Sequence, residues 1–116
     1  MGFVVYLEVV EAARCSGCGK QYGYLSIGSS KDISKPYALC DVINKFKKAG
    51  KIFESFDRMV MDKETFWKIR WEYALSFLKN PEIAERYQHK PILKTFETID
   101  KWLKGHDKYK IAYHVT

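Results

Sequence analysis

Apolar residues near the N-terminus follow a pattern that is typical of β-strands. From Phe3 to about Glu11 the chain is rich in β-branched and aromatic residues and has no polar positions at helical spacing, which predicts a strand. Gln21–Gly28 is a second candidate strand, and the short glycine-containing turn before it predicts a β-hairpin. Alternation of apolar and polar residues in Lys51–Met61 and Lys108–Val115 predicts two further strands. The last of these can pair with the hairpin.

The central segment Asp62–Lys79 has the strongest helical pattern in the chain. Its apolar residues occupy two neighbouring stripes, with Trp67, Trp71, Ala74 and Leu78 on one and Phe66, Ile69, Tyr73 and Phe77 on the other. Apolar side chains thus cover most of the circumference, and we expect this helix to be largely buried. Asp62 is placed to cap its first turn, and Asn80 followed by Pro81 ends it.

Three other segments are predicted to be helical. Pro36–Gly50 has apolar residues at helical spacing and a glycine where a C-terminal cap belongs. Asn80–Tyr87 can form a short helix. Pro91–Gly105 can form a longer one, with Ile92, Phe96, Ile99 and Leu103 on a single stripe.

The order of these elements predicts an α+β fold. We expect a small, mainly antiparallel sheet of three or four strands, made of the N-terminal hairpin and the C-terminal strand, packed against three to four helices on one face. Residues 1–116 contain no internal repeat or linker and are expected to form one domain.

Composition narrows the class of protein further. Hydrophobic residues make up 47% of the 116 residues, which excludes a disordered chain, and no apolar run approaches the ~20 residues that a membrane span requires. The first segment lacks a positively charged start and is interrupted by Glu8, so we expect no signal peptide and a cytoplasmic protein without membrane contact. Few asparagines and glutamines together with many lysines suggest a thermophilic source.

The most specific chemical pattern is Cys15-Ser-Gly-Cys18-Gly19 in the predicted hairpin turn. Two thiolates at this spacing can hold one Zn²⁺ while turn amides point at the sulfurs, and the next residue must tolerate positive φ. Locally the sequence CSGCGK resembles one knuckle of a zinc-ribbon or rubredoxin-type site, over six residues. A second Cys-x-x-Cys pair is absent from the sequence.

Cys40 is the third cysteine and can add a third ligand from the start of the following helix. A closed zinc site needs four protein ligands, and the candidates for the fourth are Asp41, His89, His106 and His114. Two alternatives remain open for the cysteines. Cys40 can be a small buried apolar residue, and Cys15 and Cys18 can form a disulfide or, less in keeping with the strand that follows, a redox pair.

No catalytic motif is present in the sequence. A glycine-rich phosphate loop, a His-Glu-x-x-His motif and a Gly-x-Ser-x-Gly motif are all missing. Glu54, Asp57, Asp62 and Glu64 can in principle gather as in a small metal-dependent nuclease, although the pattern does not distinguish them from ordinary solvated charges. We therefore favour a protein that is not an enzyme.

The net charge of +6 arises mainly from residues 31–51, which carry six lysines and two aspartates. Such a cluster can neutralise phosphates, and exposed tyrosines can stack on unpaired bases. The residues predicted to contact nucleic acid are Arg14, Lys20, Tyr22, Tyr24, Lys45, Lys47, Lys48 and Lys51. The alternative is that the lysines only solubilise the chain while the tyrosines cover its core.

Two functional hypotheses follow. The first is a small, basic zinc-knuckle protein that binds nucleic acid in a regulatory or accessory role. The second is a protein-interaction module or inhibitor, encoded for example by a virus or mobile element, whose sheet edge or aromatic patch docks a partner.

Overall fold

The computed structural model describes residues 4–82, 89–106 and 108–115, and this part of the chain contains one antiparallel sheet and three helices. The strands are β1 (Val4–Arg14), β2 (Gln21–Ser29), β3 (Ile33–Ser34), β4 (Phe53–Ser55), β5 (Arg58–Met61) and β6 (Lys110–Val115); the helices are α1 (Tyr37–Lys48), α2 (Lys63–Lys79) and α4 (His89–Leu103). The sheet order is β2-β1-β6-β5-β4, with β3 beside β1. The predicted α+β fold is confirmed.

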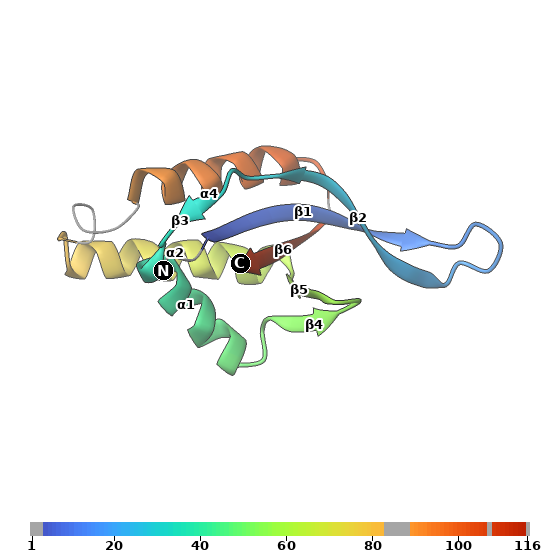
Figure 1. Ribbon diagram of the computed structural model, residues 1–116, viewed down its shortest axis with the longest axis horizontal. Helices are drawn as coiled ribbons and strands as arrows, with labels where there is room; N and C mark the ends of the chain where they lie inside the picture. Colours follow the sequence, from blue (N-terminus) through green and yellow to red (C-terminus); the bar gives the residue numbers. More distant parts are fainter. Residues whose placement is uncertain (1–3, 83–88, 107, 116) are drawn as a thin grey trace.

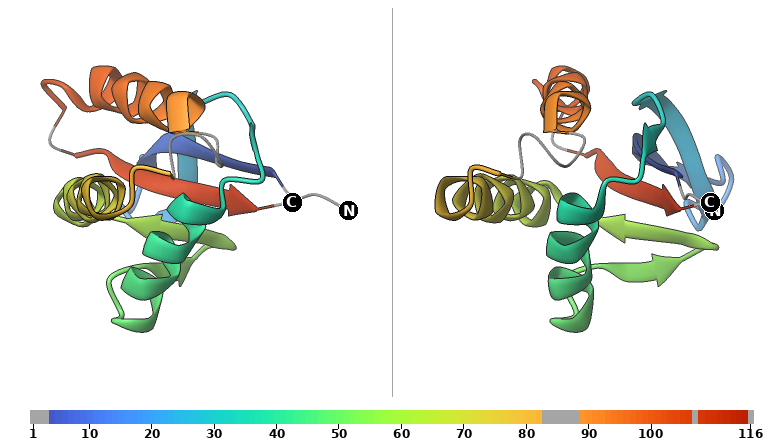
Figure 2. Two further views of the ribbon diagram at one scale, coloured as in Figure 1. Left: turned by 90° about the vertical axis from the view of Figure 1, so that its left-hand side faces the viewer. Right: turned by 60° about the vertical axis from the view of Figure 1, so that its left-hand side comes forward.

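All three helices lie on one side of the sheet (Figures 1 and 2). The core between the layers combines Leu7 and Val9 of β1 with apolar residues from every helix. In α4 the predicted stripe from Ile92 to Leu103 is buried in this core. β6 pairs with β1 from Val5↔Val115 to Val10↔Lys110, as its alternating pattern predicted.

Two corrections concern the short strands. The segment predicted as one strand, Lys51–Met61, is a hairpin in which Ser55 of β4 pairs with Arg58 of β5. Phe56 and Asp57 form its two-residue turn with φ angles of 48° and 63°. No glycine, asparagine or proline marks this turn in the sequence. The short strand β3 was not anticipated, which brings the sheet to six strands.

Helix α2 begins and ends where predicted, but only one of its stripes is buried. Asp62 Oδ1 accepts a hydrogen bond of 2.8 Å from the Thr65 amide, which caps the first turn. Tyr73 is 1% exposed, whereas Trp71 is 67% exposed. The prediction of a largely buried helix was therefore wrong for the stripe that contains Trp67, Trp71, Ala74 and Leu78, because α2 packs at the rim of the helical layer and no other described helix or strand covers this stripe.

The predicted short helix Asn80–Tyr87 lies for the most part outside the described residues. Within the described ranges, no helix is long and apolar enough to cross a membrane.

The N-terminal hairpin is longer than the sheet that it belongs to. β6 pairs with β1 only as far as Val10, so residues 11–25 continue as a two-stranded ribbon, here called the hairpin arm. The arm extends away from the helices and ends in the turn that carries Cys15 and Cys18 (Figure 1). The principal extents of the molecule, 53 × 33 × 26 Å, reflect this projection.

The sheet is strongly coiled around the face that carries no helix, here called the open face. The Tyr24 hydroxyl donates a hydrogen bond of 3.0 Å to Ser55 Oγ, although β2 and β4 are at opposite edges of the sheet. Val10, Val60 and Ala112 form a small second core beneath Tyr24 and are fully buried. The open face is therefore a shaped surface that the two sheet edges partly enclose.

Candidate functional site

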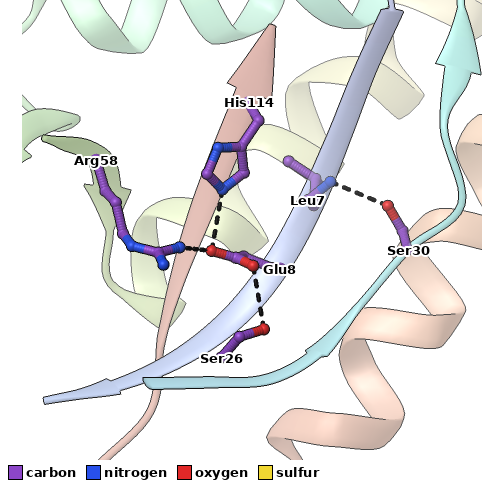
Figure 3. Close-up of polar contacts among 6 residues, drawn as sticks. All are labelled: Leu7, Glu8, Ser26, Ser30, Arg58 and His114. Atoms are coloured by element: carbon purple, nitrogen blue, oxygen red, sulfur yellow. Dashed lines mark hydrogen bonds and ion pairs between the residues drawn. The ribbon is translucent and has the colours of Figure 1, made fainter. Parts of the chain in front are cut away.

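The centre of the open face holds a buried carboxylate. Glu8 is 6% exposed, and strand pairing brings three donors to it from three other strands. Arg58 of β5 forms an ion pair with Oε1, His114 Nε2 of β6 lies 3.0 Å from Oε1, and Ser26 Oγ of β2 donates to Oε2 at 3.1 Å (Figure 3). These contacts link four strands through one side chain.

The electrostatics of this cluster favour a structural role. Burial and the positive charge of Arg58 lower the pKa of His114. At neutral pH we therefore take the imidazole to be neutral and to donate its Nε2 proton to Glu8, while its ring stacks on Tyr6 at 4.5 Å. A carboxylate that already accepts three hydrogen bonds, one of them from a guanidinium, is poorly suited to act as a general base.

Exposed aromatic rings lie beside this cluster. Phe53 on β4 is 45% exposed and Phe56 in the following turn is 49% exposed. The Phe56 ring meets Tyr24 edge-to-face at 5.9 Å, and Lys110 Nζ lies 5.4 Å from the centre of the Phe53 ring. Three aromatic rings and one lysine ammonium group thus lie along this edge of the open face.

The backbone at Phe56 is unusual for a phenylalanine. Its φ of 48° is in the left-handed region, where an L-residue other than glycine or asparagine is disfavoured by roughly 1–2 kcal/mol. Phe56 is 49% exposed, so burial in the core does not offset this conformational cost. Strain of this kind at an exposed side chain is commoner at functional positions than elsewhere.

A groove of about 680 Å³ runs along the base of the hairpin arm next to Tyr24. Arg14, Lys108 and Lys110 contribute three positive charges to its lining, and Glu11 contributes one negative charge. Arg14 also donates a hydrogen bond of 3.1 Å from Nη1 to the Gly19 carbonyl, which holds its stem against the arm. The groove therefore carries a net positive charge beside the exposed rings.

At the tip of the arm, the turn has the local geometry that the cysteine motif predicted. The backbone amides of Cys18 and Gly17 donate hydrogen bonds to the Cys15 sulfur and lower the pKa of that thiol, with a further contribution from the Cys18 side chain. The Gly19 amide donates to the Cys15 carbonyl at 2.8 Å, and Gly19 has a φ of 74°. Both cysteines are exposed.

Cys40 lies elsewhere, half-buried on α1. Burial and the neighbouring Asp41 raise its pKa to about 11. Burial raises the pKa of Tyr113 on β6, and the nearby Cys40 raises it further. The structure therefore brings the free thiols of Cys15 and Cys18 together at the tip of the arm, whereas Cys40 lies in the body of the domain.

The histidines considered as zinc ligands contact other groups. His89 Nδ1 lies 2.8 Å from the Tyr73 hydroxyl, His106 stacks on Tyr109 at 4.6 Å, and His114 contacts Glu8. Among the described residues, no three histidines, cysteines or acidic residues come together in an arrangement that could hold a metal ion. Glu54, Asp57, Asp62 and Glu64, the acidic residues considered for a nuclease, therefore do not gather into such a group either.

The predicted nucleic-acid contacts fall in two places. Lys45, Lys47, Lys48 and Lys51 lie at the C-terminal end of α1 or just after it, whereas Arg14, Lys20, Tyr22 and Tyr24 lie on the hairpin arm. Figure 1 shows these two regions well apart. Lys45 in addition forms an ion pair of 3.1 Å with Glu72 of α2. The α1 lysines therefore do not extend the positive charge of the groove.

The two tyrosines also differ from each other. Tyr24 lines the groove, whereas a register shift between Ala13 and Arg14 leaves Tyr22 opposite no residue of β1, and it is 67% exposed. Sequence reasoning missed Phe53, Phe56 and Lys110 because they come from segments far from the arm in the sequence. Glu8 was the one signal in the sequence that polar groups meet on this face, since a lone charged residue inside an apolar strand often has a buried partner.

Comparison of the chain with known protein families, with curated proteins and with solved structures finds no match.

Proposed function

We propose that this protein binds single-stranded nucleic acid on the open face of its sheet, along the groove at the base of the hairpin arm. The observation that carries the proposal is the pairing of two half-exposed rings, Phe53 and Phe56, with a groove lined by Arg14, Lys108 and Lys110. Rings that accept bases by stacking, next to cations that follow the phosphates, are how sheet surfaces bind single strands.

The strain at Phe56 supports the same proposal. A glycine or asparagine would satisfy the turn at lower cost, but only an aromatic side chain offers a stacking surface. The Glu8 cluster contributes indirectly, because Arg58 neutralises a carboxylate that would otherwise repel phosphates from the middle of the face.

Fluorescence anisotropy with a labelled oligodeoxythymidylate, measured at several salt concentrations, tests the proposal. We expect binding that weakens as salt rises. Phe53→Ala should weaken binding by roughly tenfold, since one stacked base contributes about 1–3 kcal/mol. Lys110→Gln should reduce the slope of log K against log salt by about 0.7 if it contacts one phosphate.

Lys47→Gln is the matched control, because it removes the same charge from the exposed end of α1. It should leave the affinity nearly unchanged at physiological salt, where the Debye length is about 8 Å. Lack of binding at low salt would refute the proposed function. If Lys47→Gln and Lys110→Gln weaken oligonucleotide binding equally, the binding site is not on the open face. A preference for duplex over single-stranded oligonucleotides would exclude stacking on the rings as the basis of recognition.

A further inference from the structure

We infer that Cys15 and Cys18 form one half of a tetrahedral zinc site, and that the same two cysteines of a second copy of this chain form the other half. The inference is independent of nucleic-acid binding and starts from the turn at the tip of the hairpin arm. There, the amides of Gly17 and Cys18 already point at the Cys15 sulfur, and the positive φ of Gly19 lets the chain turn back into β2. The Cys18 side chain also hydrogen-bonds to the Cys15 sulfur, so the two sulfurs lie close together before any metal binds.

Two sulfurs are half of what a structural zinc ion requires, since such sites have four protein ligands. Cys40, Asp41 and the histidines do not supply the rest, since among the described residues no three cysteine, histidine or acidic side chains come together. Cys40 lies near Tyr113, and the three histidines contact Tyr73, Tyr109 and Glu8. The residues outside the described ranges contain neither cysteine nor histidine.

A second copy supplies the missing pair in a simple way. The knuckle is at the end of a two-stranded ribbon that projects from the domain (Figure 1), so two tips can meet without a clash between the domain bodies. A two-fold axis through the metal would present Cys15 and Cys18 from both chains, giving four thiolates around one ion. Residues 14–20 are all exposed, which leaves the sulfurs accessible from outside.

The charges around the tip suit such a site. One Zn²⁺ with four thiolates carries a net charge of −2, and its formation releases up to four protons from the thiols. Arg14 and Lys20 flank the cysteines in each copy, so the dimer would place four positive charges beside the site. These charges offset the repulsion between the four thiolates and favour the assembled form.

The experiment uses the full chain, kept reduced, stripped of metal with a chelator and then titrated with ZnCl₂ alone. Native mass spectrometry and light scattering should show conversion from one chain of 13.6 kDa to a species of twice that mass. The endpoint should be half an equivalent of zinc per chain, and chelator should reverse the change. Replacement of zinc by Co²⁺ should give the visible absorption of tetrahedral four-thiolate coordination.

Cys15→Ser and Cys18→Ser should each abolish dimer formation, and far-UV circular dichroism should be unchanged because both residues are exposed at the tip. Cys40→Ser is the matched control and should dimerise with the same stoichiometry. Tight binding of one zinc per monomer, dimer formation that survives Cys15→Ser, or no zinc binding by the reduced chain would each overturn the inference. None of these readouts depends on nucleic acid, so failure here leaves the proposed function to be judged by its own assay.

Discussion

Replacement of Glu8 by glutamine tests whether one buried carboxylate holds the coiled sheet together. Glu8→Gln preserves the size of the side chain and removes only its charge. The change leaves Arg58 without its ion-pair partner and weakens the acceptor for His114 and Ser26. These partners come from three strands, so the effect should reach the whole sheet and not only β1.

The magnitude follows from how deeply each partner is buried. Removal of one member of a buried ion pair costs about 3–5 kcal/mol. The Arg58 side chain is 29% exposed and can turn toward water, whereas that of Glu8 is 8% exposed. We therefore expect the lower end, about 3 kcal/mol, out of a total unfolding free energy of roughly 5–15 kcal/mol for a domain of this size. The midpoint of thermal unfolding should fall by about 12 °C.

Urea denaturation at pH 7, followed by far-UV circular dichroism, measures this loss. Glu54→Gln is the matched control, because it makes the same chemical change on an exposed residue of β4, and it should alter stability by less than about 0.5 kcal/mol. Arg58→Met should cost less in the Glu8→Gln background than in the unmodified chain, because the shared interaction has already been lost. A loss below about 1 kcal/mol for Glu8→Gln would refute the assigned role.

Three further predictions use other parts of the structure. Phe56→Asn should raise the free energy of unfolding by about 0.5–1 kcal/mol, because asparagine tolerates the left-handed turn, and should weaken oligonucleotide binding; tighter binding on anisotropy would contradict the stacking role. Tyr73→Ala should cost about 3–5 kcal/mol in urea denaturation and Trp71→Ala less than about 1 kcal/mol, since only the former is buried; equal costs would show that both stripes are covered. Alkylation followed by mass spectrometry should modify Cys15 rapidly at pH 8 but Cys40 slowly, with the Cys40 rate rising toward its pKa of about 11. Equal alkylation rates of Cys15 and Cys40 at pH 8 would contradict the burial of Cys40. In the unfolded chain the Cys40 thiol loses its proton near the ordinary pKa of 9.0, so the stability contributed by the neutral thiol should decline as the pH rises from 9 toward 11.

Local pattern was sufficient for the long elements of this fold. The hairpin, the α2 cap at Asp62 and the α4 stripe depend on periodicity and on neighbours within a few residues. The same holds for the knuckle, because the hydrogen bonds to Cys15 Sγ come from amides two and three residues away. A short turn of this kind is determined by its own sequence.

Pattern failed where a choice depended on distant parts of the chain. Both stripes of α2 are apolar enough to be buried, and only the placement of α2 at the rim of the helical layer left Trp71 exposed and Tyr73 covered. The turn at Phe56 and Asp57 has no glycine to reveal it, so β4 and β5 were read as one strand.

The sequence by itself thus determined the element types, most of the bounds and the paired thiols at the tip of the arm. Only the tertiary structure decided that Cys40 lies in the body of the domain, that the α1 lysines are remote from the arm, and that Glu8 meets Arg58 and His114. Glu8 and His114 are 106 positions apart in the chain. Contacts at such separations follow from strand order and sheet coiling, which are set by the packing of the whole domain and leave no periodic trace in the residues concerned.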